Sequence, residues 1–162
     1  TTQFGAEMGA RVIAIETSPE RRELALEKGA HAVIDPSAVD PVTAIRDLTH
    51  GEGAHKVIET AGVAPARTAA IKGTRKWGTA CFIASEGEMT VEVGPDLTFR
   101  QVTLVGHWTF SKNGQADCAR FVSDRKIDVD SVFTHQFQLE QADEAYKLLD
   151  QQKTGKGVFL PS

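Results

Sequence analysis

Residues 11–20 read Arg-Val-Ile-Ala-Ile-Glu-Thr-Ser-Pro-Glu, and this stretch decides the expected fold. Its first half is an apolar run rich in β-branched residues, which is typical of a buried parallel strand, and Glu16 closes that run with a carboxylate. Ser18 can cap a helix, Pro19 suits the first helical position, and Glu20 favours the positive end of a helix dipole. The stretch therefore predicts a strand, a ligand-facing turn and a helix.

An acid placed in this way has a known use in folds that bind dinucleotides, where it grips the adenosine ribose from the end of the second strand. A glycine-rich phosphate turn should precede such an acid by roughly 20 residues. Glu16 comes too early in the chain for that turn, so we expect the first strand and the turn to be missing. The chain is then part of a longer polypeptide, or residues 1–10 are rearranged, or a second copy supplies the strand. A lone copy should be unstable, because each buried unpaired backbone group costs about 1 kcal/mol or more.

Composition bounds the class of protein. The 162 residues are 41% hydrophobic and 25% charged, which predicts one soluble domain without an internal boundary. A net charge of −4 argues against a nucleic-acid partner, and no apolar run approaches the ~18 residues that would cross a membrane. Cys81 and Cys118 are expected to be free thiols in a reducing, cytoplasmic compartment. The histidines have no ligand spacing, so no metal site is predicted.

Strands and helices alternate along the chain. The expected strands are residues 11–15, 31–35, 54–59, 79–84, 101–106, 132–137 and 158–160, with an exposed edge strand at 89–93 and a turn at 76–78. The expected helices are residues 1–8, 19–28, 40–51, 65–71, 113–125 and 139–150. Such alternation predicts an α/β fold with a doubly wound, Rossmann-type parallel sheet and helices on both faces, here incomplete.

Six segments, in order and spacing, closely resemble the coenzyme-binding half of the medium-chain, zinc-dependent alcohol dehydrogenase superfamily. They are residues 9–14, Glu16 with Arg21, residues 29–35, 57–62, 77–79 and 155–158. The resemblance runs through essentially the whole chain. It implies that residues 1–162 are a truncated NAD-binding domain and that the catalytic domain, with its Cys and His zinc ligands, is absent. Zinc is expected only in that missing domain.

Glu16 is the leading candidate for a cofactor contact. Its carboxylate can accept hydrogen bonds from both ribose hydroxyls and repel a 2′-phosphate, which selects NAD over NADP. The resemblance places Arg21 by the adenosine ribose or its phosphate. The alternatives are a solvated carboxylate for Glu16 and pairing with nearby acids on an exposed helix for Arg21.

Further candidates lie where the later strands end, and ligands bind open α/β sheets at such ends. The resemblance implies that the backbone near Gly62 contacts the cofactor riboses, that main-chain groups at two further strand ends hold the nicotinamide carboxamide, and that Lys156 lies near the pyrophosphate. A simple turn at Gly62, a packing role for Trp108 and an exposed loop at Lys156 remain alternatives. A lone His107 is more often structural than a general base. The residues so assigned to the cofactor are Glu59, Thr60, Ala61, Gly62, Ala84, Ser85, His107, Trp108 and Lys156, and none is assigned to catalysis.

The expected function is therefore that of the NAD-binding domain of an oxidoreductase that moves a hydride between an alcohol and NAD, with this chain alone inactive. Two alternatives stay open. One is a zinc-independent quinone or enoyl reductase that uses NADPH, against which Glu16 argues; the other is a nucleotide sensor or interaction module without catalysis. The expected partners are a small-molecule alcohol and a second copy, which the resemblance joins through sheet edges with residues 89–93 as the candidate edge.

Overall fold

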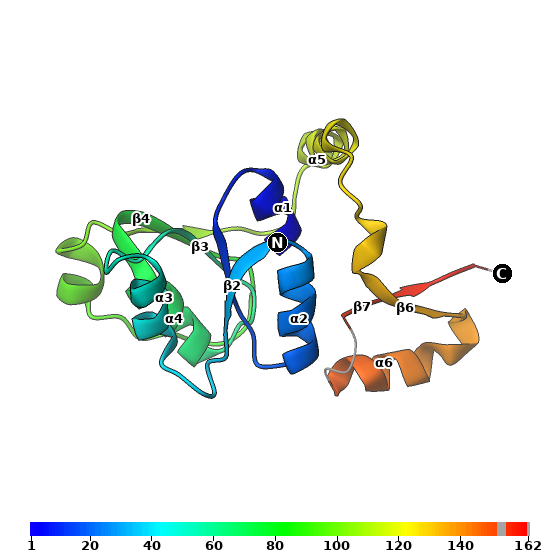
Figure 1. The fold of residues 1–162 in the computed structure, drawn as a ribbon, viewed down its shortest axis with the longest axis horizontal. Helices are drawn as coiled ribbons and strands as arrows, with labels where there is room; N and C mark the ends of the chain where they lie inside the picture. The colour runs from blue at the N-terminus through cyan, green and yellow to red at the C-terminus, as the bar shows by residue number, and fades with distance from the viewer. Residues whose placement is uncertain (152–154, 162) are drawn as a thin grey trace. The chain divides into compact units, whose positions relative to one another are not determined.

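The computed structural model describes residues 1–151 and 155–161 of the chain (Figure 1). The chain divides into two compact units. The first is the continuous segment Ile34–Thr109 together with the single residue Thr1, and the second joins Thr2–Val33 to Phe110–Ser162. Strands and helices alternate in both units, and the strand pairs whose direction is defined are parallel. The α/β class with parallel sheets of Rossmann type, predicted from the sequence, is confirmed.

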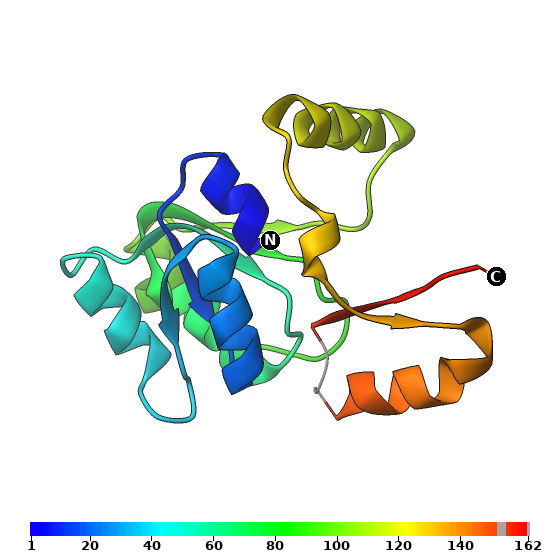
Figure 2. The ribbon, with the colours of Figure 1, turned by 45° about the vertical axis from the view of Figure 1, so that its right-hand side comes forward.

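The first unit is built around a three-stranded parallel sheet. Its strands are β3 (Ala54–Glu59), β4 (Thr74–Phe82) and β5 (Thr103–Gly106), in that order. Among the described residues, β3 pairs with β4 on one side and with no strand on the other. Two helices accompany this sheet, α3 (Pro41–Leu48) and α4 (Ala64–Gly73); α4 packs on β3 and β4, and α3 packs on α4 (Figure 2).

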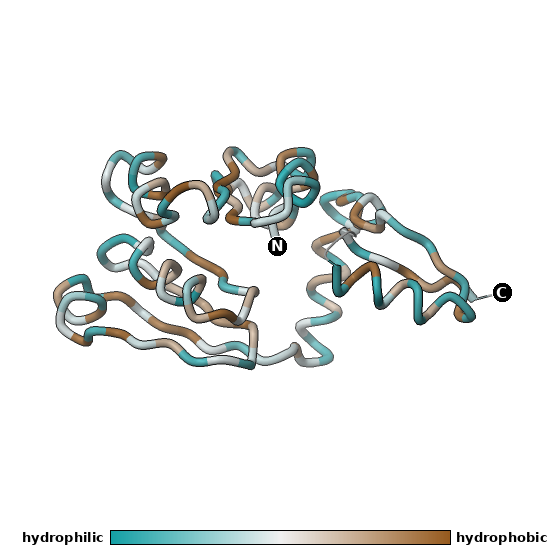
Figure 3. The backbone as a smooth tube through the Cα atoms, turned by 90° about the horizontal axis from the view of Figure 1, so that it is seen from below, coloured by the Kyte–Doolittle hydropathy of each residue, from teal (hydrophilic) through white to brown (hydrophobic). Residues whose placement is uncertain are grey.

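Small residues let the core of this unit close tightly. Ala69, Ala70 and Ile71 of α4 are buried, as is Ala80 of the strand beneath. Ile45 of α3 approaches so closely that a Cβ added at Gly73 would lie 2.6 Å from its Cδ1 atom. Figure 3 shows that hydrophobic and hydrophilic residues alternate along the chain.

Strand β4 begins earlier than its sequence predicts. We expected a turn at residues 76–78 followed by a strand from Thr79, whereas β4 starts at Thr74 and contains an irregularity. Ala54 pairs with Thr74 and Lys56 pairs with Thr79, so β4 contains more residues than β3 between the same two pairs. Within this extra stretch Trp77 has a positive φ of 56°. The turn-forming residues thus make a bulge inside the strand.

The predicted edge strand at residues 89–93 is wrong. Residues 89–92 form no strand, and a π-helical segment, η1 (Val93–Thr98), follows them. Buried Asp96 explains the difference, because its carboxylate accepts a hydrogen bond from the N–H of Glu92 at 3.0 Å and fixes a helical turn. The alternating pattern of residues 89–93 was a weak signal beside this local polar contact.

The second unit contains two short sheets. Its strands are β1 (Val12–Ile15) and β2 (Ala30–Ile34, whose last residue falls in the first unit), which pair, and β6 (Phe133–Phe137) and β7 (Lys156–Phe159), which pair in parallel. The helices are α1 (Thr2–Glu7), α2 (Pro19–Glu27), α5 (Lys112–Arg125) and α6 (Ala142–Asp150), with 3-10 turns η2 (Asp130–Val132) and η3 (Leu139–Gln141). Phe4 stacks on Phe121, which links α1 to α5.

Candidate functional site

The three strands of the first unit end together at one edge of the sheet. Glu59 at the end of β3 pairs in register with Phe82 of β4, which pairs with Gly106 of β5. The segments that follow these ends contain every candidate from residue 59 to residue 108, so the structure brings these candidates to one sheet edge. The carboxyl edge of a parallel sheet is where open α/β folds bind their ligands.

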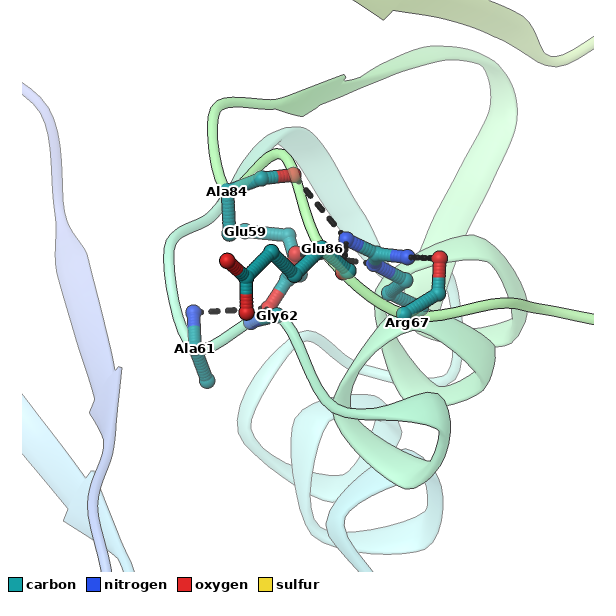
Figure 4. Close-up of polar contacts among 7 residues, drawn as sticks. Glu59, Ala61, Gly62, Arg67, Ala84 and Glu86 are labelled. Carbon is teal, nitrogen blue, oxygen red and sulfur yellow. Dashed lines mark hydrogen bonds and ion pairs between the residues drawn. The ribbon is translucent and has the colours of Figure 1, made fainter.

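The turn after β3 is organised by its own acid. The Glu59 side chain is buried, at 4% exposure, and its Oε1 accepts hydrogen bonds from the N–H groups of Ala61 at 2.7 Å and Gly62 at 2.8 Å (Figure 4). Thr60 and Ala61 are exposed. The Glu59 carboxylate therefore faces its own loop, and what the turn offers outward is backbone together with the side chains of Thr60 and Ala61.

Arg67, a residue that the sequence reasoning missed, faces this turn from α4. Its side chain is 7% exposed, its Nε lies 3.6 Å from Glu59 Oε2, and neither of these two atoms has a hydrogen-bond partner among the described residues. The guanidinium donates to the carbonyl oxygen of Ala84 at 2.9 Å and also to those of Glu86 and Gly87 (Figure 4). A signal for it existed, because Arg67 stands three and four residues before the buried Ala70 and Ile71 and so shares their helix face.

The loop after β4 approaches the turn after β3 closely. Gly62 and Gly87 have φ of 75° and 85°, a region that side chains rarely occupy. A Cβ added at Gly87 would lie 2.5 Å from the carbonyl oxygen of Gly62, which is impossible without a shift of backbone. Glycine is required at residue 87 for both reasons.

A cavity of about 410 Å³ opens beside this loop, within the first unit. Its walls come from the ends of β4 and β5 and from the following loop: Arg67, Phe82, Ala84, Ser85, Gly87, Met89, Leu104, Val105 and Gly106. The side chains are mostly apolar, while the loop contributes backbone polar groups. Such a mixture suits a flat organic group with a few hydrogen-bonding atoms.

The residues after β5 are open to solvent. The N–H of His107 donates to the carbonyl oxygen of Phe82 at 3.0 Å and extends the ladder by one bond. Trp108 is 73% exposed. Over the described residues, neither side chain makes a hydrogen bond, so His107 has no relay partner of the kind that a general base uses.

The remaining candidates belong to the second unit. Glu16 follows β1 and is partly exposed; its Oε1 accepts hydrogen bonds from the Ser18 N–H at 3.0 Å and the Thr17 hydroxyl at 3.2 Å. Ser18 caps α2 by accepting from the Arg21 N–H, and Pro19 opens the helix, both as predicted. Lys156 begins β7 and is exposed. The strand, turn and capped helix expected from residues 11–20 are confirmed.

Helix caps of this kind shift the pKa of nearby acids. A hydrogen bond from its own backbone N–H, and then one from the Ser18 hydroxyl, lower the pKa of the Glu20 carboxyl; desolvation opposes this shift, and the charge of Arg22 adds to it last. The acid in the first turn is thus held in its charged form, which the positive end of α2 also favours. The turn after β1 therefore carries the negative charges of Glu16 and Glu20 and the positive charge of Arg22, whose guanidinium donates to the carbonyl oxygens of Glu16 and Thr17.

The described residues give two further negative findings. No three His, Cys, Asp or Glu side chains among them come together in a way that could hold a metal ion. No helix within residues 1–151 or 155–161 is long and apolar enough to span a bilayer.

Comparison with known proteins defines the family. Residues 1–124 match the family described as zinc-binding dehydrogenase, and the chain belongs to this family. The resemblance to the medium-chain, zinc-dependent alcohol dehydrogenases is thereby confirmed. The chain is 34% identical over 151 residues to YphC of Escherichia coli, an uncharacterized zinc-type alcohol dehydrogenase-like protein, covering 92% of this chain and 42% of YphC. It is 29% identical to the L-threonine 3-dehydrogenase of Pyrococcus horikoshii, covering 92% and 44%.

Solved structures show the same fold. An alcohol dehydrogenase from Thermotoga maritima superimposes with a TM-score of 0.87 at 23% identity, covering 99% of this chain and 46% of that one. The benzyl alcohol dehydrogenase of Acinetobacter calcoaceticus gives a TM-score of 0.89 at 20% identity, covering 99% and 46%. The chain thus spans less than half the length of the relatives that it matches.

Proposed function

We propose that this chain is the NAD-binding part of a zinc-type alcohol dehydrogenase-like oxidoreductase, which moves a hydride between a small alcohol and the nicotinamide ring. Glu16 carries the proposal. A carboxylate at the end of β1, beside the N-terminus of α2, stands where an adenosine ribose would be held by its two hydroxyls. Its charge would repel the 2′-phosphate of NADP, which favours NAD.

The edge of the β3–β4–β5 sheet, considered by itself, has features that suit a nicotinamide ring. The cavity beside the loop after β4 has apolar walls and backbone polar groups, and glycines at residues 62 and 87 let backbone approach a ligand. Bound NAD would supply the hydride-accepting ring carbon. This chain's own residues would orient the ring and exclude water, and none of them serves as an acid or base.

The proposal places the catalytic zinc outside this chain. A metal that polarises the alcohol oxygen would belong to protein outside this chain, as would most of the substrate pocket. We therefore propose that the chain by itself does not turn over an alcohol. We also propose that the intact protein works in the cytoplasm.

We also propose a homodimer that forms through sheet edges, with β5 as the edge strand in place of residues 89–93. Residues 89–93 form no strand, whereas β5 lies at the outer position of the β3–β4–β5 order. Among the described residues β5 pairs on one side only, with β4, and such an edge can continue into the sheet of a second copy. The His107 N–H donates to Phe82 of β4, so by alternation the Leu104 N–H points away from β4. Sedimentation of the intact protein, compared with a Leu104→Pro variant that lacks this N–H, tests the arrangement.

The decisive test of the function is a titration of NAD and NADP into the full natural polypeptide that contains residues 1–162, with metal analysis of the same sample. NAD should bind more tightly than NADP, and zinc should be present. A metal-free protein that prefers NADP would support the zinc-independent reductase instead. A protein that binds neither nucleotide would overturn the proposal.

A further inference from the structure

Arg67 hydrogen-bonds to three carbonyl groups of one short loop. Its guanidinium donates to the carbonyl oxygens of Ala84, Glu86 and Gly87, all of which belong to the segment that follows β4 (Figure 4). A planar guanidinium has five N–H donors in a fixed fork, so one side chain can hold several acceptors in a defined arrangement. The conformation of this loop is therefore set by a residue of α4.

Fixing a carbonyl also fixes the N–H of the same peptide group. All described peptide bonds are trans, so each C=O points opposite to the N–H of the next residue. The three carbonyls bound to Arg67 belong to the peptide groups that carry the N–H donors of Ser85, Gly87 and Glu88. These donors must point away from the guanidinium, and within the described part of the chain they make no hydrogen bond.

Glu59 helps to hold Arg67 in place. Its Oε2 lies 3.6 Å from Arg67 Nε, both side chains are almost fully buried, and its Oε1 holds the N–H groups of the turn after β3. A buried cation needs a paired charge and satisfied donors to remain there. The pair thus joins the turn after β3 to the loop after β4.

The cavity beside this loop has the character of a site for an aromatic carboxamide. Phe82, Leu104 and Val105 provide apolar walls for a flat ring. Ser85 and Gly87, whose N–H groups make no hydrogen bond within the described part of the chain, line the same cavity. A carboxamide oxygen can accept a hydrogen bond from a backbone N–H of this kind.

We propose that Arg67 is a positioning residue for the nicotinamide end of the cofactor: by holding the carbonyls of residues 84, 86 and 87, it presents the N–H donors of Ser85 and Gly87 to the carboxamide oxygen. This inference rests on the proposed function. It assigns no chemical step to Arg67, which acts through the loop and not on the reacting atoms.

The experiment compares NAD with ADP-ribose, which has the same adenosine, pyrophosphate and ribose but no nicotinamide ring. Both are titrated into the full natural polypeptide and into its Arg67→Lys variant. Lysine keeps a positive charge beside Glu59 but cannot span three carbonyls with one ammonium group. We expect NAD affinity to fall about tenfold and ADP-ribose affinity to stay within about twofold, the size of effect that lost hydrogen bonds produce. Arg120→Lys, an exposed exchange on α5, should change neither affinity.

Equal weakening of NAD and ADP-ribose in Arg67→Lys would assign Arg67 a structural role only and overturn the inference, as would no change in either. Failure of the unsubstituted protein to bind NAD would instead overturn the proposed function and the inference with it. A second measurement needs no variant: NAD, and not ADP-ribose, should slow hydrogen exchange at the amides of Ser85 and Gly87. Equal protection by the two ligands, or none, would contradict the inference.

Discussion

The ends of β1 and β3 make an instructive pair, because each strand delivers a glutamate to its carboxyl end. Glu59 is 4% exposed, and its carboxylate accepts hydrogen bonds from its own turn and pairs with Arg67. Glu16 is partly exposed and engages Oε1 with Ser18 and Thr17. Both acids organise the turn that follows their strand, but only Glu59 is buried against a cation, while Glu16 stays partly open to solvent. Burial, and not the strand-end position, separates the two roles.

Breaking the buried pair should have the largest effect. Glu59→Ala leaves the Arg67 cation buried without its partner and frees the N–H groups of Ala61 and Gly62, so we expect a loss of roughly 3–5 kcal/mol in the free energy of unfolding. Urea denaturation measures it. Glu52→Ala, an exposed acid of the same unit, should change stability by less than about 0.5 kcal/mol. A similar small loss at Glu59 would mean that its carboxylate is dispensable for folding.

A methyl group at Gly87 should come next. The positive φ and the nearby Gly62 carbonyl together make Gly87→Ala costly, by about 1–3 kcal/mol. Gly106→Ala is the matched control, since nothing lies within 4 Å of the added Cβ and its φ is ordinary. Thermal unfolding of the two variants should separate them clearly, and equal melting temperatures would argue against the close approach of the two loops.

Glu16 should affect coenzyme choice and little else. Glu16→Gln retains an acceptor for the Ser18 N–H but removes the charge that opposes a 2′-phosphate, so the preference for NAD over NADP should fall about tenfold. The ratio of kcat/KM values for the two coenzymes measures it in the intact protein. Glu23→Gln, an exposed neighbour on α2, should leave that ratio unchanged. An unaltered ratio in Glu16→Gln would remove the main support for NAD selection.

The smallest effect concerns the cap of α3 and its dependence on pH. Hydrogen bonds from the Thr43 hydroxyl, and secondly from the Thr43 N–H, lower the pKa of the Asp40 carboxyl. Because the folded pKa lies below that of the unfolded chain, this stabilisation is present above the unfolded value, about pH 4, and is lost as pH falls through the folded value.

Asp40→Ala should therefore lower the melting temperature by roughly a few degrees at neutral pH and by less in strong acid. Asp47→Ala, an exposed acid on the same helix, should show no such pH dependence. A loss at Asp40 that grew as the pH fell would contradict this sign.

The sequence allowed the helix starts to be predicted well, because their signals are local. Ser18 with Pro19, and Asp40 with Pro41, place a cap and a first helical residue next to each other, and both helices begin there. The strand from Ala54 to Glu59 was also predicted with its exact bounds. Such features depend on neighbours within a few residues.

Features that depend on particular side-chain contacts were missed, whether the partners are near or distant in sequence. Residues 89–93 alternate like a strand, yet the Asp96 carboxylate accepts a hydrogen bond from the Glu92 N–H, four residues away, and the segment from Val93 becomes helical. In the sequence, Arg67 is one charged residue in a helix of small residues. Its role becomes visible only from its hydrogen bonds to three carbonyl groups of the loop after β4. Assigning Glu59 to the cofactor by its position gave no sign that the side chain turns inward. These contacts join residues that are up to 20 positions apart.

The continuity of the first unit has a consequence for the order of folding. Its strands and helices lie consecutively between residues 34 and 109, so its contacts close short loops, whereas the second unit must bring Thr2–Val33 to Phe110–Ser162 across that whole interval. Closing a longer loop costs more entropy and slows the search for native contacts. Amide protection should therefore develop first in β3, β4 and β5, and the aromatic contact between Phe4 and Phe121 should form late.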